Sequence, residues 1–137
     1  MFLAVSIKYN STTGESTKYW YANGQLIREG TATGEMQFAN TNFTIGAISR
    51  DSSPGYGDAE WFNGSISNIQ VYNTYLSVNQ VHALYIEGIG GAPIDLQNLV
   101  AWYPLNGNAN DYSGNGNNAV TSNVIFASSW YSGYTPP

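Results

Sequence analysis

The chain begins with apolar and polar residues in the two-residue alternation of a β-strand. Across residues 2–9 this alternation places Leu3, Val5 and Ile7 on one face. A cluster of polar residues around Gly14 follows and predicts a turn, after which the chain runs back.

The Asn23-Gly24 pair is the strongest hairpin signal in the sequence. It is flanked by β-rich runs at residues 18–22 and 25–28. Both central positions of a tight hairpin turn require positive φ, which Asn and Gly adopt readily. We therefore expect the two runs to be neighbouring antiparallel strands.

The middle of the chain predicts further short strands separated by turns. One set of apolar residues ends at Gly46 and consists of Met36, Phe38, Phe43 and Ile45. A turn-rich loop covers residues 51–58. Residues 65–72 alternate imperfectly, which predicts a strand with a bulge or a half-buried edge.

One helix is predicted, and it begins at Ser77. Gln80 stands three residues later and completes a capping box, while Gly88 can close the C-terminus. One face of the helix carries Val81, Leu84 and Tyr85.

The last third predicts a linker over residues 89–94, a strand over residues 99–104 and a long polar loop over residues 106–118. Two short strands are expected within residues 119–130. Many short strands, glycine-rich turns and one short helix predict an all-β fold, an antiparallel β-sandwich.

Composition narrows the possible partners. Charged residues make up only 9% of the chain, and the net charge is −5 at pH 7. The four cationic residues are scattered singly, so no basic patch is available for phosphates and we expect no nucleic-acid partner. No apolar run approaches the ~20 residues of a membrane span, so membrane insertion is not expected.

Cysteine is absent, which excludes disulfides, cysteine-ligated zinc and a thiol nucleophile. A surface rich in Asn, Ser, Thr and Gly and poor in Lys is typical of exported proteins. The predicted location is therefore extracellular or on a cell surface.

Two stretches of the chain resemble a known family. The first carries a Y-x-N-G strand, an I-G strand, an F-x-G-x-I segment, a strand ending in Tyr and an L-S helix start, and consists of Tyr19–Ile27, Phe43–Gly46, Phe62–Ile66, Ile69–Tyr72 and Leu76–Val81. The second, residues 99–118, carries a D-x-S-G-N loop. In this order they resemble the second half and then the opening of a laminin-G-like domain, of the concanavalin A-like lectin and glucanase jelly-roll family.

This resemblance implies a domain organisation. Residues 1–88 would be the C-terminal part of one repeat, residues 89–94 a Gly/Pro linker, and residues 95–137 the opening strand and loop of the next. First and last strands lie near each other in the family, so residues 99–104 are expected to pair with residues 65–72 and complete the same sandwich. The same pairing between chains would give a strand-swapped oligomer.

Catalysis is not expected. A glycosidase needs two carboxylates about 5–10 Å apart across a cleft. Asp58 and Glu60 are the nearest pair, but the acid motif of the family's catalytic members is missing. His82 is the only histidine and is expected to lie on the helix surface, and no G-x-S-x-G nucleophile elbow is present.

Carbohydrate binding by such folds uses aromatic faces against sugar rings and polar groups against hydroxyls. Tyr56, Asp58 and Trp61, in and beside the loop over residues 51–58, are the predicted ligand-binding residues, and Tyr56 and Trp61 are the aromatics expected to be exposed. Of the other aromatic pairs, strand alternation is expected to bury one member each.

Calcium is the candidate cofactor, because related jelly rolls hold it near the opening loop. Asp111 matches the loop aspartate of the family, and Asn106 could add a carbonyl oxygen. Asp111 could equally form a turn with its own backbone.

The predicted function is a non-catalytic carbohydrate-binding or adhesion module of a larger surface protein, with glycans or surface proteins as partners. Two alternatives stay open: a structural spacer or strand-swapping assembly repeat, and an accessory module of a glycoside hydrolase.

Overall fold

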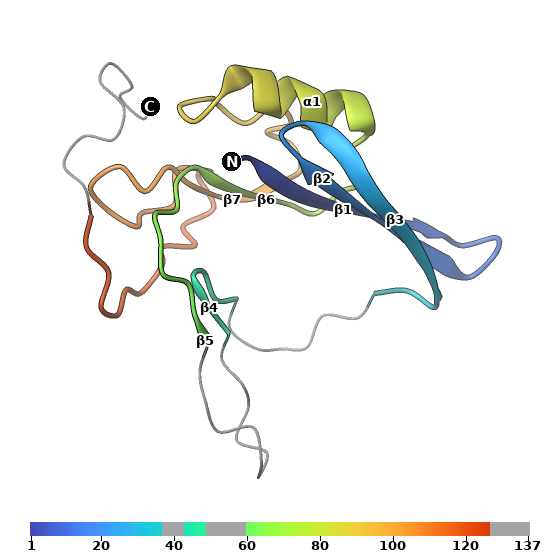
Figure 1. The fold of residues 1–137 in the computed structure, drawn as a ribbon, viewed down its shortest axis with the longest axis horizontal. Coiled ribbons are helices and arrows are strands. Elements are labelled where there is room, and N and C mark those ends of the chain that lie inside the picture. Colours follow the sequence, from blue (N-terminus) through green and yellow to red (C-terminus); the bar gives the residue numbers. More distant parts are fainter. Residues whose placement is uncertain (37–42, 49–59, 127–137) are drawn as a thin grey trace, which may run out of the picture. The chain divides into compact units, whose positions relative to one another are not determined.

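The structure is a computed structural model, and it describes residues 1–36, 43–48 and 60–126 (Figure 1). The described residues form two compact units. The larger one comprises residues 1–36 and 67–126, and the smaller one comprises residues 43–48 and 60–66.

The larger unit begins with a three-stranded antiparallel sheet in the order β1-β2-β3. Its strands are β1 (Leu3–Asn10), β2 (Glu15–Ala22) and β3 (Gln25–Thr33). The predicted turn between the first two strands is confirmed, because the Gly14 N–H donates to the Asn10 carbonyl at 2.8 Å. β3 continues to Thr33, five residues past the predicted strand end at Arg28, because β2 offers partners along its whole length.

The predicted Asn23-Gly24 hairpin is confirmed. Both residues have positive φ, 48° for Asn23 and 73° for Gly24. Gly24 is also required sterically, because a Cβ there would come within 2.7 Å of the Tyr85 ring. This turn therefore serves two purposes, since it joins β2 to β3 and leaves room for a helix side chain.

The predicted helix is α1 (Val78–Glu87). The capping box is present: the Ser77 side chain accepts from the Gln80 N–H, and the Gln80 side chain accepts from the Ser77 N–H at 2.9 Å. Gly88 ends the helix with φ of 77°. Local sequence thus determines both ends of α1.

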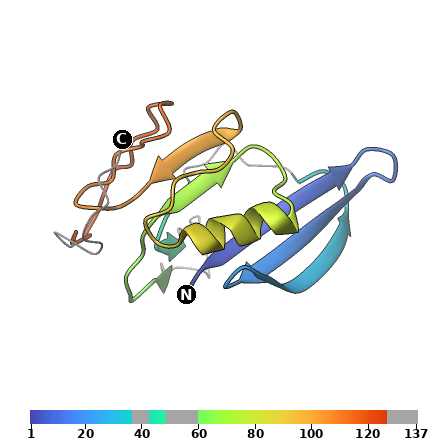
Figure 2. The same ribbon diagram turned by 90° about the horizontal axis from the view of Figure 1, so that it is seen from above.

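α1 lies along one face of the sheet (Figure 2). Val81 and Leu84 of the helix pack with Tyr21 of β2 and with Leu76, and this cluster is the core of the unit. The buried Ser6 hydroxyl connects β1 to the chain before the helix, because it donates to the Leu76 carbonyl at 2.8 Å and accepts from the Leu76 N–H at 2.9 Å.

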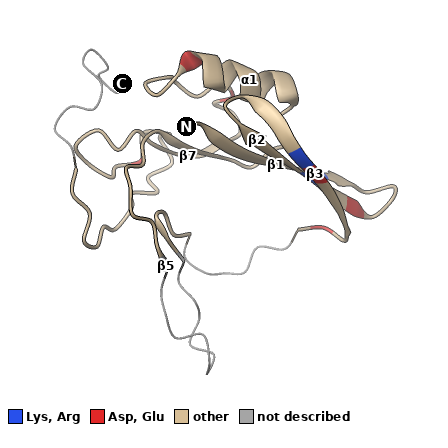
Figure 3. Ribbon diagram, viewed as in Figure 1, with Lys and Arg blue, Asp and Glu red and all other residues tan. Residues whose placement is uncertain are grey.

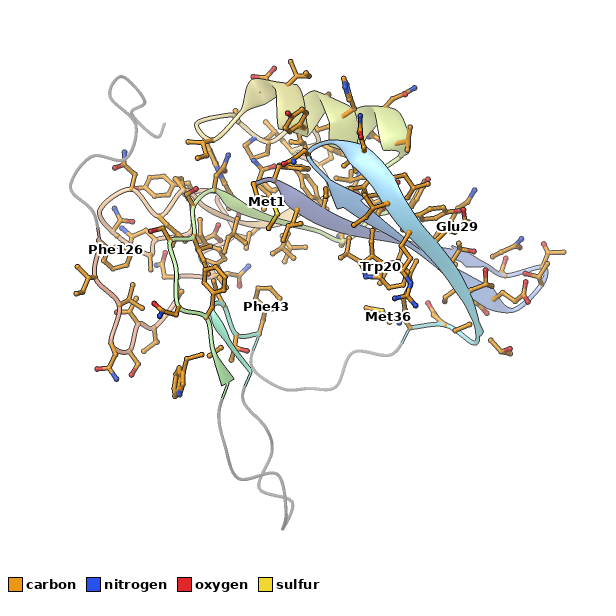
Figure 4. The ribbon with its side chains drawn as sticks, in the orientation of Figure 1. Met1, Trp20, Glu29, Met36, Phe43 and Phe126 are labelled. Carbon is orange, nitrogen blue, oxygen red and sulfur yellow. The ribbon has the colours of Figure 1, made fainter. Side chains whose placement is uncertain are left out.

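The opposite face of the sheet is the one that carries Leu3, Val5 and Ile7. Leu3 is 64% exposed and Val5 is 59% exposed. Trp20 also points away from α1 (Figure 4), and the Arg28 guanidinium stacks over its ring at 5.2 Å. The covered face holds the smaller β1 side chains Ala4 and Ser6, because Tyr21 and the helix fill the space above them.

A second sheet pairs β6 (Ile69–Tyr72) with β7 (Leu99–Tyr103) in antiparallel register, Ile69 opposite Tyr103. The expected pairing of residues 99–104 with residues 65–72 is therefore confirmed within one chain. A register shift at Val71/Tyr72 supplies the predicted irregularity. β6 is shorter than predicted because Asn68 has positive φ, 49°, which ends the extended run.

The smaller unit contains β4 (Ala47–Ile48) and β5 (Glu60–Trp61), paired antiparallel. The strand expected to end at Gly46 is wrong for residues 43–46, which lie before β4 and form no strand. Residues 119–126 also contain no strand, contrary to the prediction. Residues 37–42 and 127–130 of those two predictions lie outside the described residues.

The all-β class, with antiparallel sheets and one short helix, is confirmed. The jelly-roll sandwich stays a prediction. Within the described residues, no helix is long and apolar enough to span a membrane.

Candidate functional site

Trp61 is the predicted ligand-binding residue that the structure describes, and it ends β5. It is 71% exposed, which confirms the expectation of an exposed aromatic. It pairs with Ala47 across the β4–β5 hairpin, and the next N–H, that of Phe62, donates to the Gly46 carbonyl at 2.9 Å. Tyr56 and Asp58 lie outside the described residues.

Two further aromatics of this unit are exposed, Phe43 and Phe62. The Phe62 ring lies over Gly64, where a Cβ would come within 2.7 Å of it. Gly64 therefore lets the ring lie against the backbone without leaving the surface. Three exposed aromatic side chains therefore lie on or near the β4–β5 pair in the described part of the smaller unit.

Two other aromatic pairs, Trp20/Tyr21 and Trp102/Tyr103, differ in how many of their members are buried. Tyr21 is buried while its neighbour Trp20 is on the open face, as alternation predicts. Trp102 and Tyr103 are both buried, so the alternation expectation is wrong for β7. The reason is that β7 is covered on both faces, like a central strand.

Asp111 is held inside the loop over residues 106–118. One carboxylate oxygen accepts from the N–H groups of Trp102 and Ser113, both at 2.9 Å. The other accepts from the Ser113 hydroxyl at 2.8 Å and from the Asn117 N–H at 2.9 Å. The bond to Ser113, two residues on, is the turn alternative weighed from the sequence.

These bonds change the acidity of Asp111. Burial alone would raise the pKa of its carboxyl group. The hydrogen bonds from Trp102, Ser113 and Asn117 outweigh burial and lower the pKa below its ordinary value. Asp111 is therefore ionised at neutral pH, and its charge is satisfied by donors from its own chain.

This arrangement does not fit a calcium ion at Asp111. Calcium takes six to eight oxygen ligands, usually with carboxylates among them. Both Asp111 oxygens already accept two hydrogen bonds each. In the part of the chain that the structure describes, no group of three His, Asp or Glu side chains could hold a metal. Asn106, the other predicted ligand, is half-buried at the start of the loop.

A polar network that the sequence did not reveal fastens the predicted linker to the β6–β7 sheet. The Asn68 side chain accepts from the Trp102 indole N–H at 2.9 Å and donates to the Gly91 carbonyl at 2.9 Å. Tyr72 donates to the Gln70 side chain at 2.7 Å, and Gln70 donates to Asn68 at 3.2 Å. The polar alternation of Asn68, Gln70 and Tyr72, the first just before β6 and the other two within it, was the available signal.

Tyr72 stays a donor over the whole physiological range. Its burial raises the pKa of the hydroxyl to about 12, with a smaller contribution from the nearby Asp95 charge. Gly91 and Pro93 of the predicted linker are buried, and the Gly91 carbonyl accepts from the Asn68 side chain.

Charged side chains are sparse over the described chain (Figure 3). His82 is exposed on α1, as expected, with its ring 6.3 Å from that of Tyr85.

Comparison of the chain with protein-family models, with curated proteins and with solved structures gave no match. The laminin-G-like resemblance therefore stays a prediction.

Proposed function

We propose that this chain is a non-catalytic carbohydrate-binding or adhesion module of an extracellular surface protein. The β4–β5 hairpin is its contact surface. The observation that carries the proposal is the 71% exposure of Trp61.

An exposed tryptophan keeps a large apolar surface in contact with water, which is unfavourable unless a partner covers it. The indole could bury 150–250 Å² of surface in a core or an interface. Its flat apolar face suits the CH face of a sugar ring, and neighbouring polar groups read the hydroxyls. Phe43 and Phe62, exposed in the same unit, extend the apolar surface.

The proposal includes no catalytic step. The sequence has one histidine and no cysteine, and it lacks the acid motif of the family's hydrolases. Carbohydrate binding requires none of these catalytic groups.

The test is a glycan array followed by titration calorimetry on the strongest ligand. We expect the wild-type chain to bind, and Trp61→Ala to weaken binding at least tenfold, the equivalent of about 1.4 kcal/mol. Tyr9→Ala, which removes an exposed aromatic from β1, is the matched control and should bind like wild type.

Two results would overturn the proposal. A wild-type chain that binds no glycan on the array would leave the spacer alternative as the better account. Equal binding by wild type and Trp61→Ala would show that the hairpin is not the contact surface.

A further inference from the structure

β7 has an outer edge, the one that does not face β6. Trp102 directs both its N–H and its carbonyl to this edge, because their partners are Asp111 and Tyr112 of the following loop. Val100 directs its carbonyl the same way, toward three loop side chains. An edge of this kind, if open, would be a template for another strand.

Side chains of the loop cover this edge in place of a strand. Asn115 donates to the Leu99 carbonyl at 2.8 Å and to the Val100 carbonyl at 3.1 Å. The Asn117 side chain donates to the Val100 carbonyl at 2.9 Å, and the Ser113 hydroxyl donates to the same carbonyl at 3.2 Å. The Tyr112 N–H donates to the Trp102 carbonyl at 2.8 Å.

Asp111 is the centre of this arrangement. It closes the edge directly by accepting from the Trp102 N–H, and it shapes the loop by accepting from Ser113 and Asn117. The Asp111 N–H is held in turn by the Asn118 side chain at 2.9 Å. Without the carboxylate, the loop would lose the bonds that place its amides along β7.

We propose that the loop over residues 106–118 is an edge guard, clamped by Asp111, that prevents β7 from pairing with β7 of a second copy of this chain. This role replaces the calcium site that the resemblance implied for Asp111. It is independent of glycan binding by Trp61, which lies in the other unit.

A second copy of this chain is the expected pairing partner because of the residue composition of β7. Residues 99–103, Leu-Val-Ala-Trp-Tyr, carry no charge and no proline, and they include aromatic and β-branched side chains. Such a run pairs readily with an identical run. Two copies meeting edge to edge in antiparallel fashion satisfy the two-fold symmetry of a homodimer.

The experiment is size-exclusion chromatography with light scattering at neutral pH on wild type and Asp111→Ala, each with calcium and with a chelator. We expect wild type to be monomeric in both conditions. Asp111→Ala should form dimers or larger species in both. An oligomeric wild type, or a folded Asp111→Ala that stays monomeric, overturns the guard.

Circular dichroism establishes whether Asp111→Ala folds. If it does not, the double variant Asn115→Ala/Asn117→Ala decides, because it removes amide donors to β7 and leaves the Asp111 bonds in place. Self-association of this variant supports the guard, and a monomer contradicts it. The control is Asn110→Ala, because the bond of Asn110 to Asn108 uses its backbone N–H.

Calorimetric titration of wild type with calcium chloride tests the replaced site. No heat of binding is expected. Calcium binding that Asp111→Ala abolishes would restore the metal site and refute the clamp.

Discussion

Two tryptophans of this chain show what separates a structural aromatic from a candidate contact. Trp102 on β7 is 4% exposed, and its indole N–H is bonded to Asn68. Trp61 on β5 is 71% exposed at the end of a two-residue strand. Trp102 follows Ala101 in a run without charge, whereas Trp61 directly follows Glu60.

The difference lies in how each neighbourhood satisfies polar groups. Around Trp102, the Asn68 network and the Asp111 loop provide partners for backbone and side-chain polar groups on both sides of β7. Such a network allows a strand to be buried on both faces without unpaired polar groups. The β4–β5 hairpin has two residues in each strand. It is too short to bury a face, and its aromatics stay on the surface.

The largest effect is expected from truncating the buried member of the pair. Trp102→Ala should lower the free energy of unfolding by about 3–5 kcal/mol, because it leaves a cavity in the core. Trp61→Ala should change it by less than about 0.5 kcal/mol, as surface substitutions usually do. Urea unfolding followed by circular dichroism measures both. Similar costs for the two variants would remove the distinction between them.

Trp102→Phe refines this measurement. It keeps an aromatic ring in the core, removes the N–H that donates to Asn68 and leaves a smaller cavity than alanine does. A cost between those of wild type and Trp102→Ala is expected, and a cost equal to that of Trp102→Ala would show that the retained ring does not stabilise the core without the bond to Asn68.

Features decided by local chemistry could be predicted from the sequence. The Asn23-Gly24 turn needs only positive φ at two adjacent residues, and the Ser77–Gln80 capping box closes within one helical turn. Both therefore appear in the structure as predicted. The pairing of β6 with β7 was predicted from the family resemblance, not from local pattern.

Features decided by distant partners could not be predicted. Asn68 meets Trp102 across 34 residues, and no local pattern indicates that contact. Asp111 was correctly placed in a polar loop, but its role depends on the Trp102 and Asn117 N–H groups, which only the fold brings to it. The exposure of Trp61 was predicted because a turn-rich loop precedes it, and turn-rich segments lie on surfaces.

A smaller effect separates paired from unpaired hydroxyl groups. Tyr72→Phe removes the hydroxyl that donates to Gln70 and should cost about 1 kcal/mol. Tyr21→Phe is the matched change in the helix-covered core. The buried Tyr21 hydroxyl has no hydrogen-bond partner among the described residues, so its loss should be neutral or stabilising. Thermal and urea unfolding compare the two, and a larger loss for Tyr21→Phe would contradict the assignment.

The smallest effect is expected from pH, because Asp111 is only half-buried and solvent screens part of its interaction. Its folded-state pKa is lowered relative to the unfolded chain, where an aspartate titrates near ~3.9. The ionised carboxylate therefore stabilises the fold at all pH values above that unfolded value, and this contribution is lost as the pH falls through the folded pKa. Other carboxylates titrate in the same range, so the quantity to measure is the difference in unfolding free energy between wild type and Asp111→Asn. That difference should be constant from neutral pH down to about pH 5 and shrink below it. A difference that stays constant into strong acid would mean that the charge of Asp111 does not hold the loop on β7.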